Sequence, residues 1–306
     1  MFAVNIEMLP RIKLMGFVSY KQPWVHFTRT TNEYVLYFIK SGELHLTENG
    51  THYILKKGDI LILEPNLEHA GTKKHVCDYY YIHFEHPDIN FVQVEDMLTM
   101  ARRFILEEET QQAEGGSSSC HFPKHYVLSK KVLSLSFQAM NEMLQLYRRK
   151  YFNRGLTALK FMEWLIEVSR EHFIAALQEH EGSSTKPLIK VHTLLEYIHE
   201  HYTDKITGSG IAQEFDCNYD YMNRIFTKLT GESIMRYVNR VRINHAKELI
   251  EATHLPFGEI GYLTGLDDPF YFSKVFKKYV GVTPSEYYRE VREQGKLDHS
   301  SSNRKL

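Results

Sequence analysis

Residues 219–237 read YDYMNRIFTKLTGESIMRY, and residues 269–287 read PFYFSKVFKKYVGVTPSEY. The aromatic and glycine positions of the first stretch recur 50 residues later in the second, in the pairs Tyr221 and Tyr271, Phe226 and Phe276, Gly231 and Gly281, Tyr237 and Tyr287. Upstream, Ile211 and Ile260 repeat at an offset of 49, so the second copy has one additional residue in its turn. The chain therefore contains two similar structural units.

Each copy has the pattern of a short helix, a turn and a second helix. Apolar residues at spacings of three and four predict one buried face for each second helix; they are Met222, Ile225, Phe226 and Leu229, and Phe272, Val275, Phe276 and Tyr279. Asn218 and Asp268 precede these helices and are good N-caps, and Pro269 suits a first helical position. Both copies are predicted to be helix-turn-helix units.

A single helix is predicted between the two units, from Ser233, its expected N-cap, to Thr253. Some 20 residues at about 1.5 Å each span roughly 30 Å, and one turn of B-DNA is about 34–36 Å long. We therefore expect a rigid spacer that places the two second helices in successive major grooves on one side of a duplex.

The run from Gly265 to Tyr287 resembles the signature of the AraC/XylS family of bacterial transcription regulators. The resemblance covers residues 188–292 and implies an all-α domain with two helix-turn-helix units that binds double-stranded promoter or operator DNA. It also implies RNA polymerase and a second copy of the chain as partners. Activation and repression of transcription both remain open.

By position in the family motif, the resemblance implies base contacts near the start of each second helix and phosphate contacts farther along. Arg can pair with guanine and Asn with adenine, and Lys274 in place of the common Arg loses the bidentate fork. The expected DNA-binding residues are Asp220, Asn223, Arg224, Lys228, Phe270, Ser273, Lys274, Lys277 and Lys278.

The region from residue 10 to residue 92 contains short apolar runs separated by turn signals such as Asn49-Gly50 and Gly58-Asp59, which is typical of a β-sandwich or barrel. The stretch from Gly58 to His69 resembles a conserved segment of cupin barrels, with Asn66 where cupins have Gly. Asn also tolerates a left-handed backbone. The resemblance implies that residues 1–92 form a cupin-like sensor domain.

Small β-barrels bind ligands in their interior, and aromatic faces combined with a few polar groups suit a sugar. The expected effector is therefore a small molecule, with a sugar favoured. The candidate ligand-binding residues are Trp24, His26, Arg29, Tyr37, Glu68, His69, Tyr79, Tyr81 and His83.

Cupin enzymes hold a metal ion with a His-x-His pair, a Glu and a further His, and this chain has His69 but no His-x-His pair upstream. We therefore expect no metal, no cofactor and no enzymatic activity. Two alternatives remain open: a metal-dependent cupin enzyme with an appended DNA-binding domain, and a regulator whose barrel only oligomerises.

The remaining segments complete an α+β multidomain architecture. A helix is expected over 96–109, a flexible loop over 111–119, and an antiparallel helix pair over 130–150 and 155–177. The family resemblance implies that the helical segment 93–178 makes the dimer contact. The alternative is that these helices only cover the barrel. Residues 179–187 are expected to be a linker, and 293–306 a polar C-terminal tail.

The composition of the 306-residue chain fits two packed domains, with 43% hydrophobic residues. Its net charge of −1 gives no general attraction to nucleic acid, so DNA binding has to rest on local clusters of Lys and Arg. Three Cys far apart in sequence argue against a disulfide framework and favour a reducing compartment. The sequence has no export signal and no long apolar run, so we expect a cytoplasmic protein that does not enter the membrane.

Overall fold

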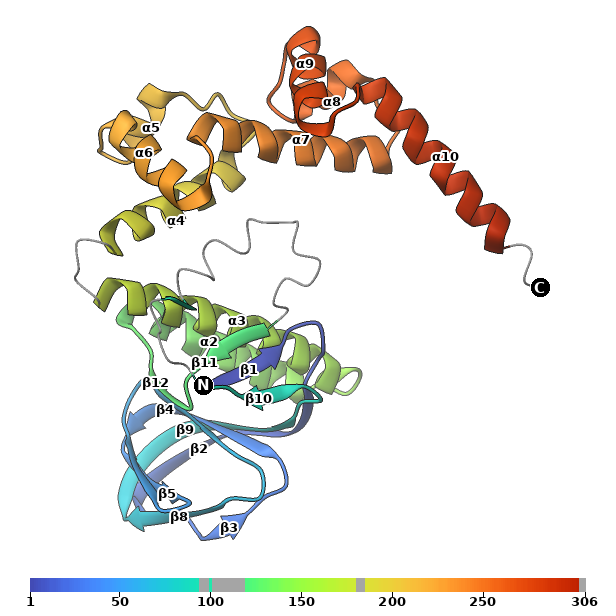
Figure 1. Cartoon of the computed structure of the whole chain (residues 1–306). Helices are drawn as coiled ribbons and strands as arrows, with labels where there is room; N and C mark the ends of the chain where they lie inside the picture. The colour runs from blue at the N-terminus through green and yellow to red at the C-terminus, as the bar shows by residue number, and fades with distance from the viewer. Residues whose placement is uncertain (94–98, 101–118, 180–184, 303–306) are drawn as a thin grey trace. The chain divides into compact units, whose positions relative to one another are not determined.

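The computed structural model describes residues 1–93, 99–100, 119–179 and 185–302. The chain divides into two compact units, Met1–Glu179 and His180–Leu306. The first unit is rich in strands and the second is helical, which confirms the predicted fold class (Figure 1). The expected helix over 96–109 and loop over 111–119 lie almost entirely outside the described residues, as does most of the expected linker.

In the part of the first unit that the structure describes, the strands are antiparallel and form three sheets, and two helices pack against them. Five strands pair in the order β12-β7-β4-β9-β2, four in the order β3-β8-β5-β6, and three in the order β10-β1-β11. Their bounds are β1 Phe2–Asn5, β2 Arg11–Trp24, β3 Arg29–Thr30, β4 Tyr34–Gly42, β5 Leu44–Glu48, β6 Thr51–Leu55, β7 Asp59–Leu63, β8 Glu68–Lys73, β9 His75–Glu85, β10 Ile89–Phe91, β11 Ser119–Phe122 and β12 His125–Val127. The predicted barrel is thus built from separate sheets rather than from one closed ring of strands.

Strand β4 shows why the sequences of the central strands in the five-stranded sheet are almost continuously apolar. Its odd-numbered residues Val35, Tyr37 and Ile39 pack in the core shared with β5 and β6 of the four-stranded sheet, whereas Leu36 and Phe38 pack in the core shared with the helices. Because successive side chains of a strand point to opposite faces, both faces of this sheet are buried.

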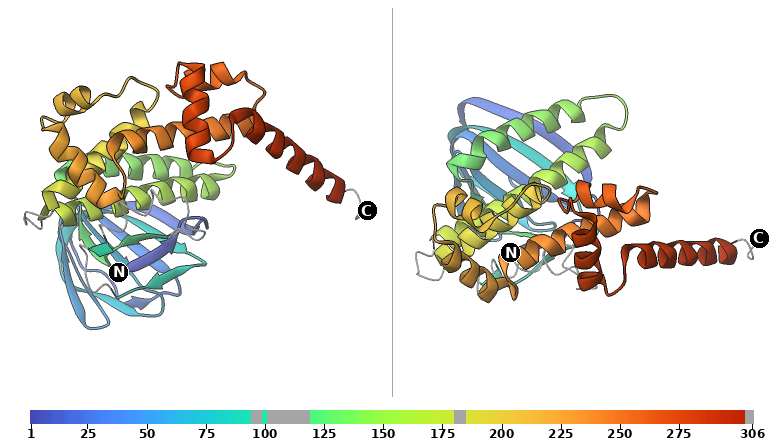
Figure 2. Two further views of the ribbon diagram at one scale, coloured as in Figure 1. Left: turned by 45° about the horizontal axis from the view of Figure 1, so that its top comes forward. Right: turned by 90° about the horizontal axis from the view of Figure 1, so that it is seen from above.

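Two helices form a hairpin over the outer face of the five-stranded sheet (Figure 2). They are α2 (Lys130–Tyr147) and α3 (Asn153–Glu179). Buried side chains of both helices, including Met140, Phe161 and Trp164, join the core with β4, β7 and β9. The indole N–H of Trp164 donates to the hydroxyl oxygen of Ser136 at 3.0 Å and locks the two helices together.

Two boundaries differ from the sequence prediction. Strands β11 and β12 lie within 93–178, which was assigned to helices; they form because β1 and β7 offer free edges for pairing, at Phe2↔Phe122 and Ile60↔Tyr126 for example. At the other end, the helix α10 (Pro284–Ser302) continues through most of the expected polar tail.

The second unit contains two helix-turn-helix units that share one long helix. The first consists of α5 (Gly208–Glu214) and α6 (Tyr219–Thr230), preceded by α4 (Thr185–His201). The second consists of α8 (Phe257–Leu263) and α9 (Pro269–Val280), followed by α10. Between them, α7 (Ile234–Ala252) is unbroken and about 28 Å long. This agrees with the helix predicted over 233–253.

The two halves of α7 support different units. Near its start, Tyr237 packs edge-on against Phe226 of α6, with ring centroids 5.4 Å apart. Towards its end, Ile243 and Ile250 share a core with Phe272 of α9. None of the described helices is both long enough and apolar enough to cross a lipid bilayer.

Candidate functional site

The second helix of each unit starts with the predicted cap. The carboxamide oxygen of Asn218 accepts from the backbone N–H of Tyr221 at 3.0 Å, and the carboxylate of Asp268 accepts from the N–H of Tyr271 at 2.6 Å. Both helices end at a glycine with a left-handed backbone, Gly231 in the first and Gly281 in the second. The sequence repeat is therefore also a repeat of backbone structure.

One face of each of these helices is buried and the opposite face is exposed. Met222 and Phe226 of α6 are fully buried, as are Phe272 and Phe276 of α9. The exposed residues include seven of the nine predicted DNA contacts, namely Asp220, Arg224, Lys228, Phe270, Lys274, Lys277 and Lys278. The guanidinium of Arg224 lies over the ring of Tyr221, 5.7 Å from its centroid.

The other two predicted contacts, Asn223 and Ser273, are half-buried and bonded within the protein. The carboxamide oxygen of Asn223 accepts from the backbone N–H of Ile234 at 3.0 Å and so caps α7. Ser233, which we expected to do this, makes no side-chain cap bond. The hydroxyl of Ser273 donates to the carbonyl oxygen of Pro269 at 3.0 Å.

The two helix-turn-helix units are connected by α7 itself and, in addition, by the contacts of a side chain at the centre of α7. Arg242, only 8% exposed, donates from Nε to the carbonyl oxygen of Tyr202 at 2.7 Å and from Nη2 to that of Asp204 at 2.6 Å. The same loop lies against Gly265, in the turn before α9, where a Cβ would come within 2.7 Å of the carbonyl oxygen of Thr203. The segment that leads into the first unit thus contacts the turn of the second.

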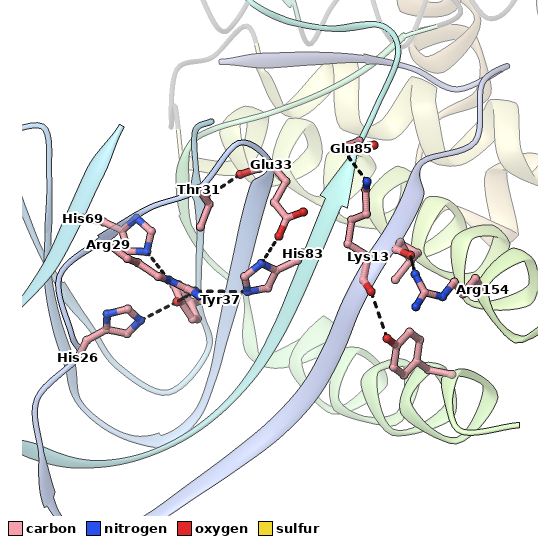
Figure 3. A network of polar contacts seen from close by, with 12 residues as sticks. Lys13, His26, Arg29, Thr31, Glu33, Tyr37, His69, His83, Glu85 and Arg154 are labelled. Carbon is pink, nitrogen blue, oxygen red and sulfur yellow. Dashed lines mark hydrogen bonds and ion pairs between the residues drawn. The ribbon is translucent and has the colours of Figure 1, made fainter. Parts of the chain in front are cut away.

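In the strand-rich unit, Met1–Glu179, the side chain of Arg29 lies among three histidines and a tyrosine (Figure 3). Its Nε donates to Nε2 of His69 at 3.0 Å. Its Nη2 lies 3.2 Å from the hydroxyl oxygen of Tyr37 and 3.3 Å from Nε2 of His83. Nε2 of His26 lies 2.9 Å from the same tyrosine oxygen. Five residues from β3, β4, β8, β9 and the segment before β3 therefore form one hydrogen-bond network.

One proton arrangement satisfies all of these bonds. An arginine only donates, so the Nε2 atoms of His69 and His83 accept and their protons lie on Nδ1. The Nδ1–H of His83 then donates to Oε1 of Glu33 at 2.6 Å. The Nδ1–H of His26 donates to the carbonyl oxygen of Phe27 at 2.7 Å, which leaves its Nε2 to accept from Tyr37. All three imidazoles are neutral in this arrangement.

Burial is the main cause of that neutrality. It lowers the pKa of His26 and of His69 to about 4 in each case, and the positive charge of Arg29 acts in the same direction. Burial also lowers the pKa of His83, although its bond to Glu33 opposes the shift. The guanidinium of Arg29 therefore donates to uncharged acceptors, and the carboxylate of Glu33 lies beyond His83.

Aromatic rings adjoin this network. Trp24 stacks on Tyr20, with centroids 4.2 Å apart and planes at 6°, and lies 5.4 Å from the ring of His26. Tyr79 packs edge-on against Tyr37 at 5.4 Å. The Tyr81 ring packs over Gly16, where a Cβ would come within 2.3 Å of its hydroxyl oxygen.

The structure thus brings eight of the nine predicted ligand-binding residues together. Glu68 is the exception, because it is exposed and strand alternation directs it away from the buried His69. Tyr20 and Glu33 belong to the cluster but were not predicted. Strand alternation with Val18 would have indicated Tyr20, whereas no local signal points to Glu33. Among the described residues, no group of three or more His, Cys, Asp and Glu side chains has a geometry that could hold a metal ion.

Two family models match this sequence. Residues 16–113 match the AraC-like ligand binding domain, and residues 211–290 match a helix-turn-helix domain. The chain belongs to the AraC family of transcriptional regulators. The ligand-binding match falls in the strand-rich unit and the helix-turn-helix match falls in the helical unit.

Several transcriptional regulators are similar to this AraC-family chain, and the similarity extends over most of their length. It is 28% identical to the uncharacterized HTH-type transcriptional regulator YisR of Bacillus subtilis, covering 89% of this chain and 91% of YisR. It is 26% identical to the Msm operon regulatory protein of Streptococcus mutans, covering 85% and 86%. It is 22% identical to the HTH-type transcriptional activator RhaS of Enterobacter, covering 82% and 84%.

Proposed function

We propose that this AraC-family regulator binds a promoter or operator by inserting α6 and α9 into successive major grooves. The observation that carries the proposal is the unbroken α7, whose length of about 28 Å approaches one turn of B-DNA. The bond of Arg242 to the loop after α4 supports it further, since a second connection limits rotation of one unit against the other.

Within this arrangement we assign a role to five of the exposed side chains. Arg224 pairs with a guanine, and Asp220 faces a base from the first turn of α6. Lys228, Lys277 and Lys278 lie in the last turns of the two helices and contact phosphates, which fix the register without reading sequence. Asn223 contributes by holding α7 in place, because its oxygen is already bonded to Ile234.

We further propose that the effector is a sugar bound at the Arg29 network. The half-buried rings of Trp24 and Tyr20 adjoin the network and would stack on C–H groups of a sugar, and the polar atoms around Arg29 would supply directed hydrogen bonds. The protein would act in the cytoplasm as a homodimer that contacts RNA polymerase. The likeness to an activator, RhaS, favours activation as its effect.

Selection of bound sequences from random duplex DNA tests the DNA-binding proposal. We expect two short motifs whose centres are about 10–10.5 base pairs apart, one for each major groove. A single motif, or two motifs at variable spacing, would show that α7 does not act as a rigid spacer.

A thermal-shift screen of monosaccharides and disaccharides tests the effector. A sugar that binds only the folded protein raises Tm, because binding adds RT ln(1 + [L]/Kd) to the free energy of unfolding. Arg29→Gln should abolish the shift, and Lys40→Gln, an exposed change on β4, should retain it. If no sugar raises Tm, the strand-rich unit is an oligomerisation module or binds another class of molecule. Metal retained in stoichiometric amount through chelation would favour the enzyme alternative.

A further inference from the structure

The first turn of α9 exposes a phenylalanine that the fold does not use. Phe270 is 87% exposed, whereas Phe272, Val275 and Phe276 of the same helix form its packed face. The free energy of the system falls when an apolar group covers an apolar ring that was exposed to water. The ring lies two positions after the N-cap Asp268, where a helix inserted in a major groove meets base edges.

The internal repeat offers a direct comparison for this position. Phe270 corresponds to Asp220 and Lys274 corresponds to Arg224, and all four side chains are exposed. The position between them is bonded internally in both copies, through Asn223 to Ile234 and through Ser273 to the α9 backbone. The two helices thus have one geometry but different chemistry: a carboxylate and a guanidinium on α6, a phenyl ring and an ammonium on α9.

A phenyl ring has no donor or acceptor for the polar edges of bases. In the major groove the C5 methyl group of thymine is the apolar feature of the base edges, and Phe is among the side chains that contact it. We propose that Phe270 reads a thymine methyl group in the half-site bound by α9. This inference rests on the proposed insertion of α9 in the major groove.

Replacing thymine by deoxyuridine tests the inference, because the exchange removes only the methyl group. The full chain is first used to select a bound sequence from random duplexes. The half-site of α6 is then the one in which Arg224→Ala changes the base preference, and the other half-site belongs to α9. Each thymine of the α9 half-site is replaced in turn, and Kd is measured by fluorescence anisotropy.

The parent protein should bind about three- to tenfold more weakly when one particular thymine is replaced, as expected for the loss of one buried methyl group. Phe270→Ala should bind the two forms of that site equally, while Phe270→Leu, which stays apolar, should keep part of the difference. Arg224→Ala should lower the affinity for both forms and leave their ratio as in the parent.

Three results would overturn the inference: an α9 half-site without thymine, a parent protein that tolerates every replacement, or a Phe270→Ala variant that keeps the full difference. In each of these cases the protein still selects DNA, so the proposed function stands. If no sequence is selected at all, the proposed function and this inference fail together. Thermal unfolding of the variants should match that of the parent, since the ring is exposed.

Discussion

At the residue scale, the Arg29 network shows how burial and hydrogen bonding set charge states together. Three histidines accept at Nε2 because an arginine and a tyrosine hydroxyl donate to them. Protonating Nε2 of His69 or of His83 would bring two donors face to face in a buried site, because the guanidinium of Arg29 only donates. Protonating Nε2 of His26 would require the Tyr37 hydroxyl to turn from donor to acceptor. The neutral state of the histidines is therefore a condition for the folded arrangement.

This condition predicts a pH dependence of stability. The folded pKa of His69 is about 4, below its ordinary value of 6.5, so the unfolded chain binds more protons between these two values. The stabilisation is complete above about pH 6.5 and is lost as the pH falls towards 4. Denaturant unfolding of the parent should give a smaller free energy of unfolding at pH 5 than at pH 7.

The His69→Gln variant isolates the contribution of this residue, because Gln can still accept from Arg29 but does not titrate. Its free energy of unfolding should fall less between pH 7 and pH 5 than that of the parent. His52→Gln, on the exposed side of β6, should fall as much as the parent. An equal fall for His69→Gln and parent would mean that the pH dependence arises elsewhere.

A second residue-scale prediction concerns the exposed face of α6. Arg224→Ala should weaken binding to the selected site by about 1–3 kcal/mol and relax the base preference at one position. Lys277→Ala, on α9, should instead weaken binding to all sequences alike and reduce the salt slope by about one. Titrations at several salt concentrations distinguish the two outcomes. An Arg224→Ala variant with the parent's affinity would remove this residue from base readout.

At the element scale, α7 is both a spacer and a shared part of two cores. Its first turn is capped by Asn223 of α6, its centre is bonded through Arg242 to the loop after α4, and its second half packs on α9. A helix held at three places along its length bends less than an exposed rod. The distance between α6 and α9 is therefore set by tertiary contacts as well as by helix length.

Replacing Arg242 tests this arrangement. Arg242→Met leaves the carbonyl oxygens of Tyr202 and Asp204 without their donor, which should cost about 1–3 kcal/mol of stability. Affinity should also become less sensitive to spacing: inserting two base pairs between the half-sites should weaken the variant less than the parent. Arg289→Met, an exposed change on α10, should behave like the parent in both measurements. A variant that is less stable but equally sensitive to spacing would limit Arg242 to a structural role.

At the scale of the whole molecule, a strand-rich unit and a helical unit occur in one chain. An effector changes DNA binding only if it binds the available arrangements of the chain with different affinities. Linkage then requires the effect to be reciprocal.

We therefore predict that the sugar identified by thermal shift changes the Kd for the selected DNA by some factor, and that this DNA changes the Kd for the sugar by the same factor. Isothermal titration calorimetry in both orders measures the two factors. Arg29→Gln should reduce both effects, while its DNA affinity without sugar should equal that of the parent. Unequal factors would show that one of the two ligands acts outside this equilibrium.

The sequence by itself determined the features that depend on short-range interactions. The caps Asn218 and Asp268 and the length of α7 follow from contacts three or four residues apart. The left-handed backbone of Asn66, with φ of 63°, likewise follows from a local turn pattern. Chemical identity and spacing decide these features before any tertiary contact forms.

Only the tertiary structure decided which distant residues meet. It joined Arg29 to His69 and His83, moved the capping of α7 from Ser233 to Asn223, and drew residues 119–127 into the sheets. These contacts depend on strand register and on the packing of one element against another. Because packing energy is shared among many residues far apart in the chain, a local sequence pattern does not predict these contacts.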